Sequence, residues 1–301
     1  MFDFLTNIIM YSLLFSMNIS TNSGYYMDAM QKNSDSPAII NQNSLGIDIS
    51  APYAVVLDKK SKKILYEKNK NLQTPIASVT KLMTALVFLN HNPGWETKLK
   101  IEPSDFRPGN HALLRAGDEV TVKDLFYLTL IPSSNEASMA LVRSTGMSVN
   151  AFIEEMNSLA KKFRLEYTYF IDPTGLEPAN ISTAYEISLL ADRAFQEKDI
   201  IYVVQKKEYE FQVLNTRRRV IAKSTDKLLD SFINNKENNY VIVGAKTGYI
   251  DESLYNFVAE VRRDNHSIIL AIFGSKTSDD RWIEAKGLSE WTFSNFRWKN
   301  E

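Results

Sequence analysis

The chain has 301 residues, of which 44% are hydrophobic and 11% aromatic, and this is ample for the packed core of one large domain or two modest ones. Its 35 basic and 36 acidic residues leave a formal charge of −1, which provides no electrostatic footprint for nucleic acid or an anionic membrane surface. The absence of cysteine excludes disulfides, zinc–thiolate sites and thiol catalysis, and the three scattered histidines predict no metal site, so we expect no cofactor.

The first 50 residues are predicted to lie outside the folded domain. Residues 1–20 hold a short apolar run, 8–17, of the length of a signal-peptide core, although no early Lys or Arg and no small-x-small cleavage site accompany it. We interpret them as a signal peptide or N-terminal membrane anchor, which predicts export to the periplasm or the extracytoplasmic face of the membrane; the alternative is an apolar tail. Residues 21–50 are rich in Asn, Ser, Asp and Gln and are typical of a polar tether, so folding is expected to begin near Ala51.

Strand patterns occur at both ends of the remaining chain. Residues 53–58 and 63–67 flank a short polar turn, as two strands of a hairpin do, and residues 208–214, 220–223, 240–248, 254–261 and 267–274 also have strand patterns. A last helix is predicted over 279–296.

The middle of the chain is predicted to be helical. A helix is expected from Ser78, loops over 92–117, and further helices after Thr121, over 135–144, after Ser148 and after Thr183, several of them opened by capping residues. The connections are too short for crossovers, so the fold class is α/β of the α+β kind. An antiparallel sheet from the N- and C-terminal segments would carry an inserted all-helical subdomain at about 76–205, within one domain of residues 51–301.

Ser78 and Lys81 are the first candidate catalytic pair. In a helix, residues at i and i+3 share a face, so the two side chains are expected to touch. A serine needs a neighbouring base to become a nucleophile, and a helix start offers unpaired N–H groups for an oxyanion. Ser-x-x-Lys occurs twice more, at Ser158 and Ser224, but only the first copy opens a helix that is apolar nearly all round.

Two further motifs follow in the sequence. Ser133-Ser134-Asn135 lies just after Pro132, between two predicted helices, and Lys246-Thr247-Gly248 ends a predicted strand. Taken alone, residues 133–135 are as readily explained as a helix cap, and residues 246–248 as the end of a strand. Residues 276–278 nearly repeat the Lys-Thr-Gly motif. Their order after Ser78, on a loop and a strand, is the arrangement found in penicillin-recognising enzymes.

With these motifs, the stretches 75–85, 125–137, 172–176, 182–184 and 244–249 resemble those of D-alanyl-D-alanine carboxypeptidases among the low-molecular-mass penicillin-binding proteins. The resemblance runs from about Ala51 to the C-terminus and implies a β-lactamase/transpeptidase-like fold. It also implies a serine-type hydrolase that removes the terminal D-alanine from peptidoglycan stem peptides ending in D-Ala-D-Ala. β-Lactam antibiotics would then be covalent inhibitors.

The resemblance also assigns a role to each motif residue. It implies that Ser78 is the nucleophile and Lys81 its general base, while Ser133 relays the proton to the leaving D-Ala. Asn135 would hold Lys81 and the substrate amide. Lys246 and Thr247 would bind the terminal carboxylate of the substrate, and Gly248 would leave room for the substrate to lie against the backbone. The N–H groups of Ser78 and Tyr249 would form the oxyanion hole.

Three alternatives remain open on the same residues. A β-lactamase would add a glutamate for deacylation, and the candidate, Glu177, stands three residues before Asn180 where four are expected, which favours a loop residue. A DD-endopeptidase would need the same catalytic atoms. A non-catalytic peptidoglycan-binding protein would have no need for a buried lysine. The sequence also departs from the family at residues 253–255, where small residues are common.

Overall fold

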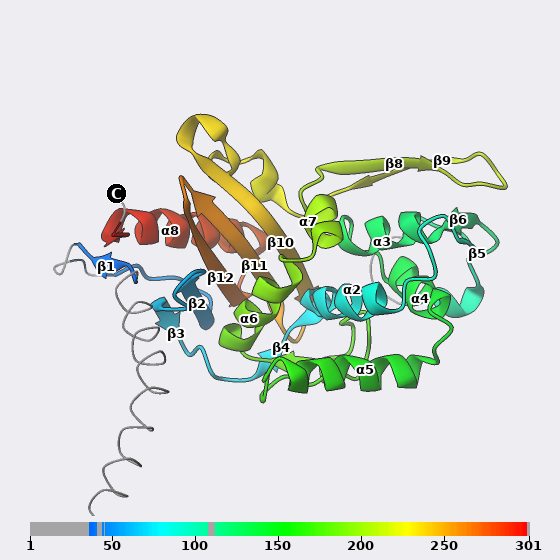
Figure 1. Cartoon of the computed structure of the whole chain (residues 1–301), viewed down its shortest axis with the longest axis horizontal. Helices are drawn as coiled ribbons and strands as arrows, with labels where there is room; N and C mark the ends of the chain where they lie inside the picture. The colour runs from blue at the N-terminus through cyan, green and yellow to red at the C-terminus, as the bar shows by residue number, and fades with distance from the viewer. Residues whose placement is uncertain (1–35, 41–43, 45, 108–111, 300–301) are drawn as a thin grey trace, which may run out of the picture.

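The centre of the molecule is a five-stranded antiparallel sheet, seen in a computed structural model that describes residues 36–40, 44, 46–107 and 112–299 (Figure 1). Its strand order is β10-β11-β12-β2-β3. The strands are β2 (Tyr53–Asp58), β3 (Ile64–Lys68), β10 (Tyr240–Ile250), β11 (Leu254–Arg263) and β12 (His266–Ser275). The N-terminal hairpin pairs with the C-terminal strands along β2 and β12, so the predicted sheet from two ends of the chain is confirmed.

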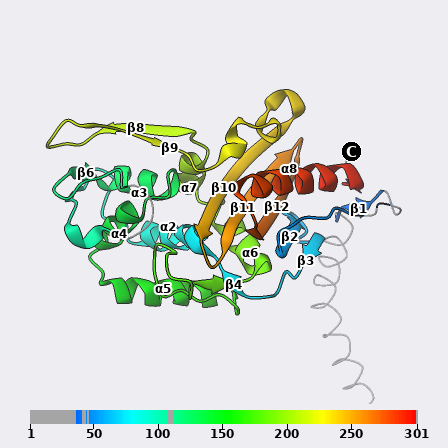
Figure 2. The same ribbon diagram turned by 180° about the vertical axis from the view of Figure 1, so that it is seen from behind.

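The two faces of the sheet carry two hydrophobic cores. Successive side chains of a strand point to opposite faces, and on β2 Val55 belongs to one buried cluster while Val56 belongs to the other. Helix α6 (Ala184–Ala194) covers the first face, in front of the sheet in Figure 1, and α8 (Ser278–Asn295) covers the second, in front in Figure 2. The sheet is therefore a buried layer between helices.

The remaining helices form a second lobe around the almost fully buried α2. They are α2 (Lys81–Asn90), α3 (Val122–Leu130), α4 (Asn135–Ser144), α5 (Val149–Lys162) and α7 (Lys198–Val204). The capping signals in the sequence are real, because the side chains of Thr121, Ser148 and Thr183 each accept a backbone N–H from the first turn of a helix. Helix α7 was not predicted as a separate helix.

Short paired strands connect the loops of this lobe. They pair in twos: β4 (Thr74–Pro75) with β7 (Ile181–Ser182), β5 (Lys98–Lys100) with β6 (Glu119–Thr121), and β8 (Glu208–Gln212) with β9 (Arg219–Lys223). The β8–β9 hairpin lies along α3, where Tyr209 donates its hydroxyl to Asp124 Oδ1 at 2.7 Å (Figure 1).

The packed structure begins before the expected boundary at Ala51. Strand β1 (Ala38–Ile39) pairs with β13 (Phe296–Arg297) beyond the last helix, and Ile49 is buried in the core under α8. Part of the segment interpreted as a tether, 21–50, is therefore attached to the domain. The expected signal peptide or anchor, residues 1–20, lies outside the described residues. Within the described part of the chain, no helix is both long and apolar enough to cross a membrane.

Candidate active site

Ser78 and Lys81 meet at a change of helix type. Ser78 lies in a 3-10 turn, η1 (Ala77–Thr80), and Lys81 is the first residue of α2, so the predicted helix start is divided into two segments. A 3-10 turn brings residues i and i+3 into line, and Lys81 Nζ donates to Ser78 Oγ at 2.9 Å. Lys81 is fully buried, whereas Ser78 is only half-buried. The hydroxyl is accessible to a substrate while its partner is shielded from water.

Lys81 has two further acceptors. Its Nζ donates to Asn135 Oδ1 at 2.8 Å and to the carbonyl oxygen of Thr174 at 2.6 Å. Burial lowers the pKa of Lys81 to about 7, although the carboxylates of Asp172 and Glu136 oppose the shift. A lysine that is half neutral near pH 7 is able to take a proton from the neighbouring hydroxyl.

The carbonyl of Thr174 is directed at Lys81 by a tight turn. The buried carboxylate of Asp172 accepts the backbone N–H groups of Thr174, Gly175 and Leu176 at 3.0, 2.5 and 2.8 Å. The fully buried Asn180 holds the turn from behind, because its Nδ2 donates to Asp172 O at 2.7 Å and its Oδ1 accepts the N–H of Asp172 at 3.1 Å. The turn and the catalytic pair thus form one rigid unit.

Two glycines allow the backbone to pass close to Ser78. A Cβ at Gly175, where φ is +83°, would lie 2.0 Å from the carbonyl oxygen of Ala77. A Cβ at Gly248 would lie 2.8 Å from the carbonyl oxygen of Ile76 and 3.3 Å from the nitrogen of Ser78. The turn after Asp172 and strand β10 are therefore both held against η1, and neither site has space for a side chain.

Ser133 and Asn135 come from the loop between α3 and α4. Ser133 has a left-handed backbone, φ +62°, which is uncommon for a residue other than glycine and costs energy that the surrounding structure must supply. Ser134 caps α4 by accepting the N–H of Ala137 at 3.0 Å, so Asn135 is the first residue of the helix. This geometry turns Ser133 and Asn135 toward the buried lysines.

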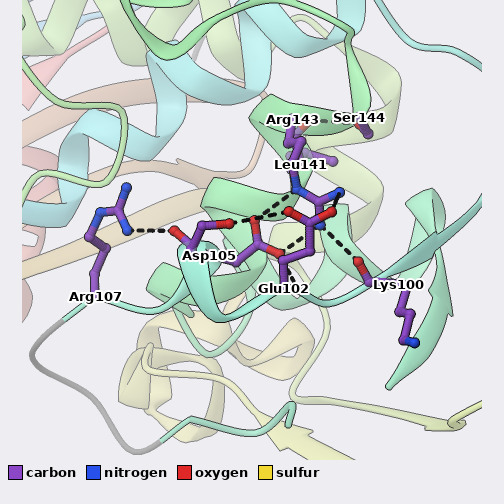
Figure 3. A network of polar contacts seen from close by, with 8 residues as sticks. Lys100, Glu102, Asp105, Arg107, Leu141, Arg143 and Ser144 are labelled. Carbon is purple, nitrogen blue, oxygen red and sulfur yellow. Dashed lines mark hydrogen bonds and ion pairs between the residues drawn. The ribbon is translucent and has the colours of Figure 1, made fainter. Parts of the chain in front are cut away.

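The far end of α4 is fixed by an arginine (Figure 3). Arg143 donates to the buried carboxylate of Asp105 at 3.0 and 2.7 Å and to the carbonyl oxygen of Lys100 at 2.8 Å. It also lies 3.1 Å from a carboxylate oxygen of Glu102. Because α4 begins at Asn135, this network restrains the helix that carries a site residue.

Lys246 reaches the site from the sheet. On β10 its Nζ donates to Ser133 Oγ at 2.8 Å and to the carbonyl oxygen of Thr247 at 3.0 Å. Burial, and then the positive charges of Lys81 and Arg281, hold the pKa of Lys246 well below its usual range. Two buried lysines thus lie on either side of the two serines.

The next residues of β10 face the other side of the strand. Thr247 Oγ1 lies 2.6 Å from Thr225 Oγ1, and the ring of Tyr249 packs against Tyr255 with centroids 4.5 Å apart. The Tyr249 side chain is 47% exposed and donates its hydroxyl to Asp251, so its phenol group is directed away from the buried lysines. Of the eight predicted residues, Lys81 donates to Ser78 and Asn135, Lys246 donates to Ser133, and Thr247, Gly248 and Tyr249 follow Lys246 on the same strand.

Sequence reasoning missed several residues of this site. Asp172 and Thr174 lay within a matching stretch and Asn180 served only as the spacing reference for Glu177, so none of them carried an assigned role, and the backbone carbonyl of Thr174 has no side-chain signature. Arg281, on α8, donates to the carbonyl oxygens of Gly248 and Asn256, both at 3.3 Å. An arginine in a polar helix start offers no local signal that it lies under the site.

The other candidate signals lie elsewhere or have structural uses. Ser158 is exposed on α5, and the Oγ of Ser224 accepts the N–H of Asp226 at 3.1 Å, while Lys227 is exposed. Neither copy forms the contact that Ser78 makes with its lysine. Glu177 is exposed on a loop, and its carbonyl oxygen accepts the N–H of Asn180 at 2.9 Å.

Comparison with known proteins gives the same assignment as the motifs. The chain is 29% identical over 252 residues to the D-alanyl-D-alanine carboxypeptidase DacF of Bacillus subtilis, covering 82% of this chain and 63% of that protein. It is 34% identical over 213 residues to a D-alanyl-D-alanine endopeptidase of Haemophilus influenzae, covering 68% of each. The chain therefore spans less than two thirds of the Bacillus protein.

A solved structure and a family model extend this comparison. The Streptomyces K15 DD-transpeptidase superposes with a TM-score of 0.74 at 26% identity, over 82% of this chain and 98% of that one. The fold is thus the expected mixed α and β fold of DD-peptidases. A family model described as D-alanyl-D-alanine carboxypeptidase matches residues 37–277, which is most of the chain and includes every site residue named above except Arg281. The chain belongs to the D-alanyl-D-alanine carboxypeptidase family of serine peptidases.

Proposed function

We propose that this protein is a serine-type D-Ala-D-Ala carboxypeptidase, which removes the terminal D-alanine from peptidoglycan stem peptides through an acyl-enzyme on Ser78. The observation that carries the proposal is the 2.9 Å contact between the accessible hydroxyl of Ser78 and a fully buried lysine whose pKa is lowered to about 7. A binding protein would have no use for a lysine kept near its neutral form.

In the acylation step, Ser78 Oγ attacks the carbonyl carbon of the penultimate D-Ala while Lys81 takes the hydroxyl proton. The backbone N–H groups of Ser78 and Tyr249 stabilise the oxyanion, a role supported by the close approach of β10 to η1 at Gly248. The C–N bond then breaks, and the nitrogen of the leaving D-Ala receives a proton through Ser133. The hydrogen bond from Lys246 to Ser133 supports that path.

The substrate carboxylate is bound by Lys246 and Thr247. Both are buried on β10, and because β10 is the edge strand of the sheet, side chains from its two faces are able to reach one anion beside that edge and shield it from solvent. Asn135 accepts a hydrogen bond from Lys81 through its oxygen, and its N–H₂ group is the donor that we assign to the substrate amide.

Deacylation by water regenerates Ser78, and we propose that Glu177 takes no part in it. Its exposure and its position on the outside of the Asp172 turn support this reading over that of a β-lactamase. Penicillin should then remain attached for long periods. A Glu177→Ala variant should release it at the wild-type rate, whereas a lifetime lengthened about a hundredfold would favour the β-lactamase reading.

An endopeptidase that cleaves cross-links is the second candidate. The relatives that are named D-alanyl-D-alanine endopeptidase, including the Haemophilus protein, favour this activity. The two activities require the same catalytic atoms, so incubation with purified muropeptides and mass analysis of the products distinguishes them. Loss of one D-alanine supports the carboxypeptidase, and conversion of dimers to monomers supports the endopeptidase.

The proposed substrate lies outside the cytoplasm, so we also propose that residues 1–20 direct export, with or without cleavage. Fractionation of cells that express a tagged full-length chain tests this, and a wholly cytoplasmic protein would contradict it.

Covalent labelling with a fluorescent penicillin tests the central proposal. The wild type should gain one penicillin by intact mass, and Ser78→Ala should gain none. Ser158→Ala, which changes the exposed serine of another Ser-x-x-Lys copy, is the matched control and should label as the wild type does. Labelling of folded Ser78→Ala would refute the assignment.

A further inference from the structure

The segment 224–226, between β9 and the 3-10 turn η3 (Lys227–Asp230), lies against the active site. The N–H of Thr225 donates to the carbonyl oxygen of Ile131 at 3.1 Å, next to the loop of Ser133, and its hydroxyl contacts that of Thr247. The segment therefore connects two of the three motifs, although the sequence analysis singled it out only for a copy of Ser-x-x-Lys.

Asp226 is a buried acid in this segment that the mechanism does not use. It is 7% exposed, and its Oδ1 accepts the N–H of Leu228 at 2.8 Å. Among the described residues, no hydrogen-bond donor reaches its Oδ2, and the Nε of Arg281 is likewise without an acceptor. Arg281 thus influences the Asp226 carboxyl electrostatically, while no hydrogen bond between the two side chains satisfies either buried atom.

The charged groups around Asp226 come from three elements. Arg281 on α8 and Lys246 on β10 favour its ionised form, whereas Asp230 at the end of η3 and, above all, burial oppose it. Together these raise the pKa of Asp226 to about 6. The carboxyl is therefore ionised above about pH 6 and neutral below it.

The positive charges that face Asp226 are those that the substrate carboxylate needs. We infer that Asp226 is a specificity-determining residue, whose ionised carboxylate competes with the terminal carboxylate of the substrate for the positive field of Lys246 and Arg281. The inference rests on the proposed function, in which Lys246 and Thr247 bind that carboxylate.

The sign of the effect follows from the charges that remain when Asp226 is neutral. Arg281 stays charged, because guanidinium groups keep their proton in proteins. The negative charge of Asp226 favours the protonated form of Lys246, so its loss lowers the pKa of Lys246. This effect is small, because Asp226 is the weakest of the named influences on that pKa. A neutral residue 226 therefore leaves the pocket more positive and favours an anionic substrate.

The test compares benzylpenicillin, which carries a carboxylate, with its uncharged methyl ester. The second-order acylation rate of each is measured by intact mass between pH 5 and 8, and the acid-to-ester ratio cancels any effect on Ser78 and Lys81. In the wild type the ratio should rise as the pH falls through about 6, and because the lowered pKa of Lys246 affects wild type and variants alike, the difference between them is what reports Asp226. Asp226→Asn should raise the ratio at pH 8 by about three- to tenfold, which is the scale of one charge several ångströms away. At pH 5 the ratios of the variant and the wild type should become equal.

Two further variants complete the design. Asp230→Asn removes an exposed carboxylate from the same turn and should leave the ratio at pH 8 near the wild-type value. Asp226→Ala removes the charge and also the acceptor for Leu228, so it should show the same rise in ratio despite a lower Tm. A purely structural role would change the Tm and leave the pH profile of the ratio unaltered.

The outcomes separate the inference from the proposed function. If the wild type acquires no adduct from either compound, the proposed function fails. If it is acylated by both, but the ratio for Asp226→Asn equals or falls below that of the wild type at pH 8, the proposed function stands and the role of Asp226 is overturned.

Discussion

Lys246 on the sheet donates to Ser133 on the helical lobe at 2.8 Å, so one hydrogen bond joins the two halves of the proposed catalytic machinery. Each residue is held in place by its own half: Lys246 by the pairing of β10 with β11, and Ser133 by a left-handed backbone next to the cap of α4. The relative position of sheet and lobe therefore decides whether the proton path is intact.

Lys246→Ala should lower the acylation rate by benzylpenicillin about 10- to 100-fold, because a charged hydrogen-bond donor is worth roughly 1.5–3 kcal/mol. The rate of acylation by the methyl ester should fall by a smaller factor. Lys276→Ala is the matched control, since Lys276 opens the near-repeat of the motif but is exposed. Equal losses with acid and ester would argue that Lys246 acts on the proton path alone.

The acylation rate should depend on pH through Lys81. Only the neutral amine accepts a proton, and burial lowers its pKa to about 7. Acylation by the uncharged ester should therefore rise with pH up to about 7 and level off above it. Measured rates that are constant from pH 5.5 to 8 would show that another group is the base.

Removal of Asp172's charge should move this profile to lower pH. Its carboxylate stabilises the protonated form of Lys81, so Asp172→Asn should lower the lysine pKa further and shift the acid limb of the profile downward. Glu136→Gln should act in the same direction but less, since its carboxylate is the smaller influence. The exposed Glu177→Gln serves as the control and should leave the midpoint unchanged.

Gly175→Ala should disturb Ser78 as well as stability. Gly146 has a similar backbone, φ +77°, but open space around it, so Gly146→Ala isolates the backbone penalty of about 1–2 kcal/mol. Gly175→Ala adds an overlap with the carbonyl of Ala77 and should lower the Tm by at least twice as much and abolish most penicillin labelling. Similar Tm and labelling for the two variants would mean that the turn moves away freely.

The features that the sequence predicted correctly are those with a local cause. Thr121 and Asp124 form a capping box within one helical turn, and the side chain of Ser148 caps α5 by accepting the N–H of Ala151, so three or four residues suffice to identify a helix start. The alternating strands and the order of the three motifs likewise required no knowledge of distant contacts.

The features that were missed depend on contacts between distant segments. The two-residue strand β1 has no pattern of its own and exists because β13 offers it a partner. Arg281 and Asp226 lie far apart in the sequence and are brought under β10 only when α8 packs on the sheet. The 3-10 turn at Ser78 similarly follows from the close packing of Gly175 and Gly248 against it.

The pairing of β2 with β12 also determines when this protein is able to fold. Strands β2 and β3 emerge first during synthesis, but β12, with which β2 pairs, is nearly the last strand to be made. Bringing β2 and β12 together closes a long loop, which has an entropic cost. Until then the apolar hairpin has an unpaired edge. A chain interrupted before β12 should consequently aggregate rather than yield a stable fragment.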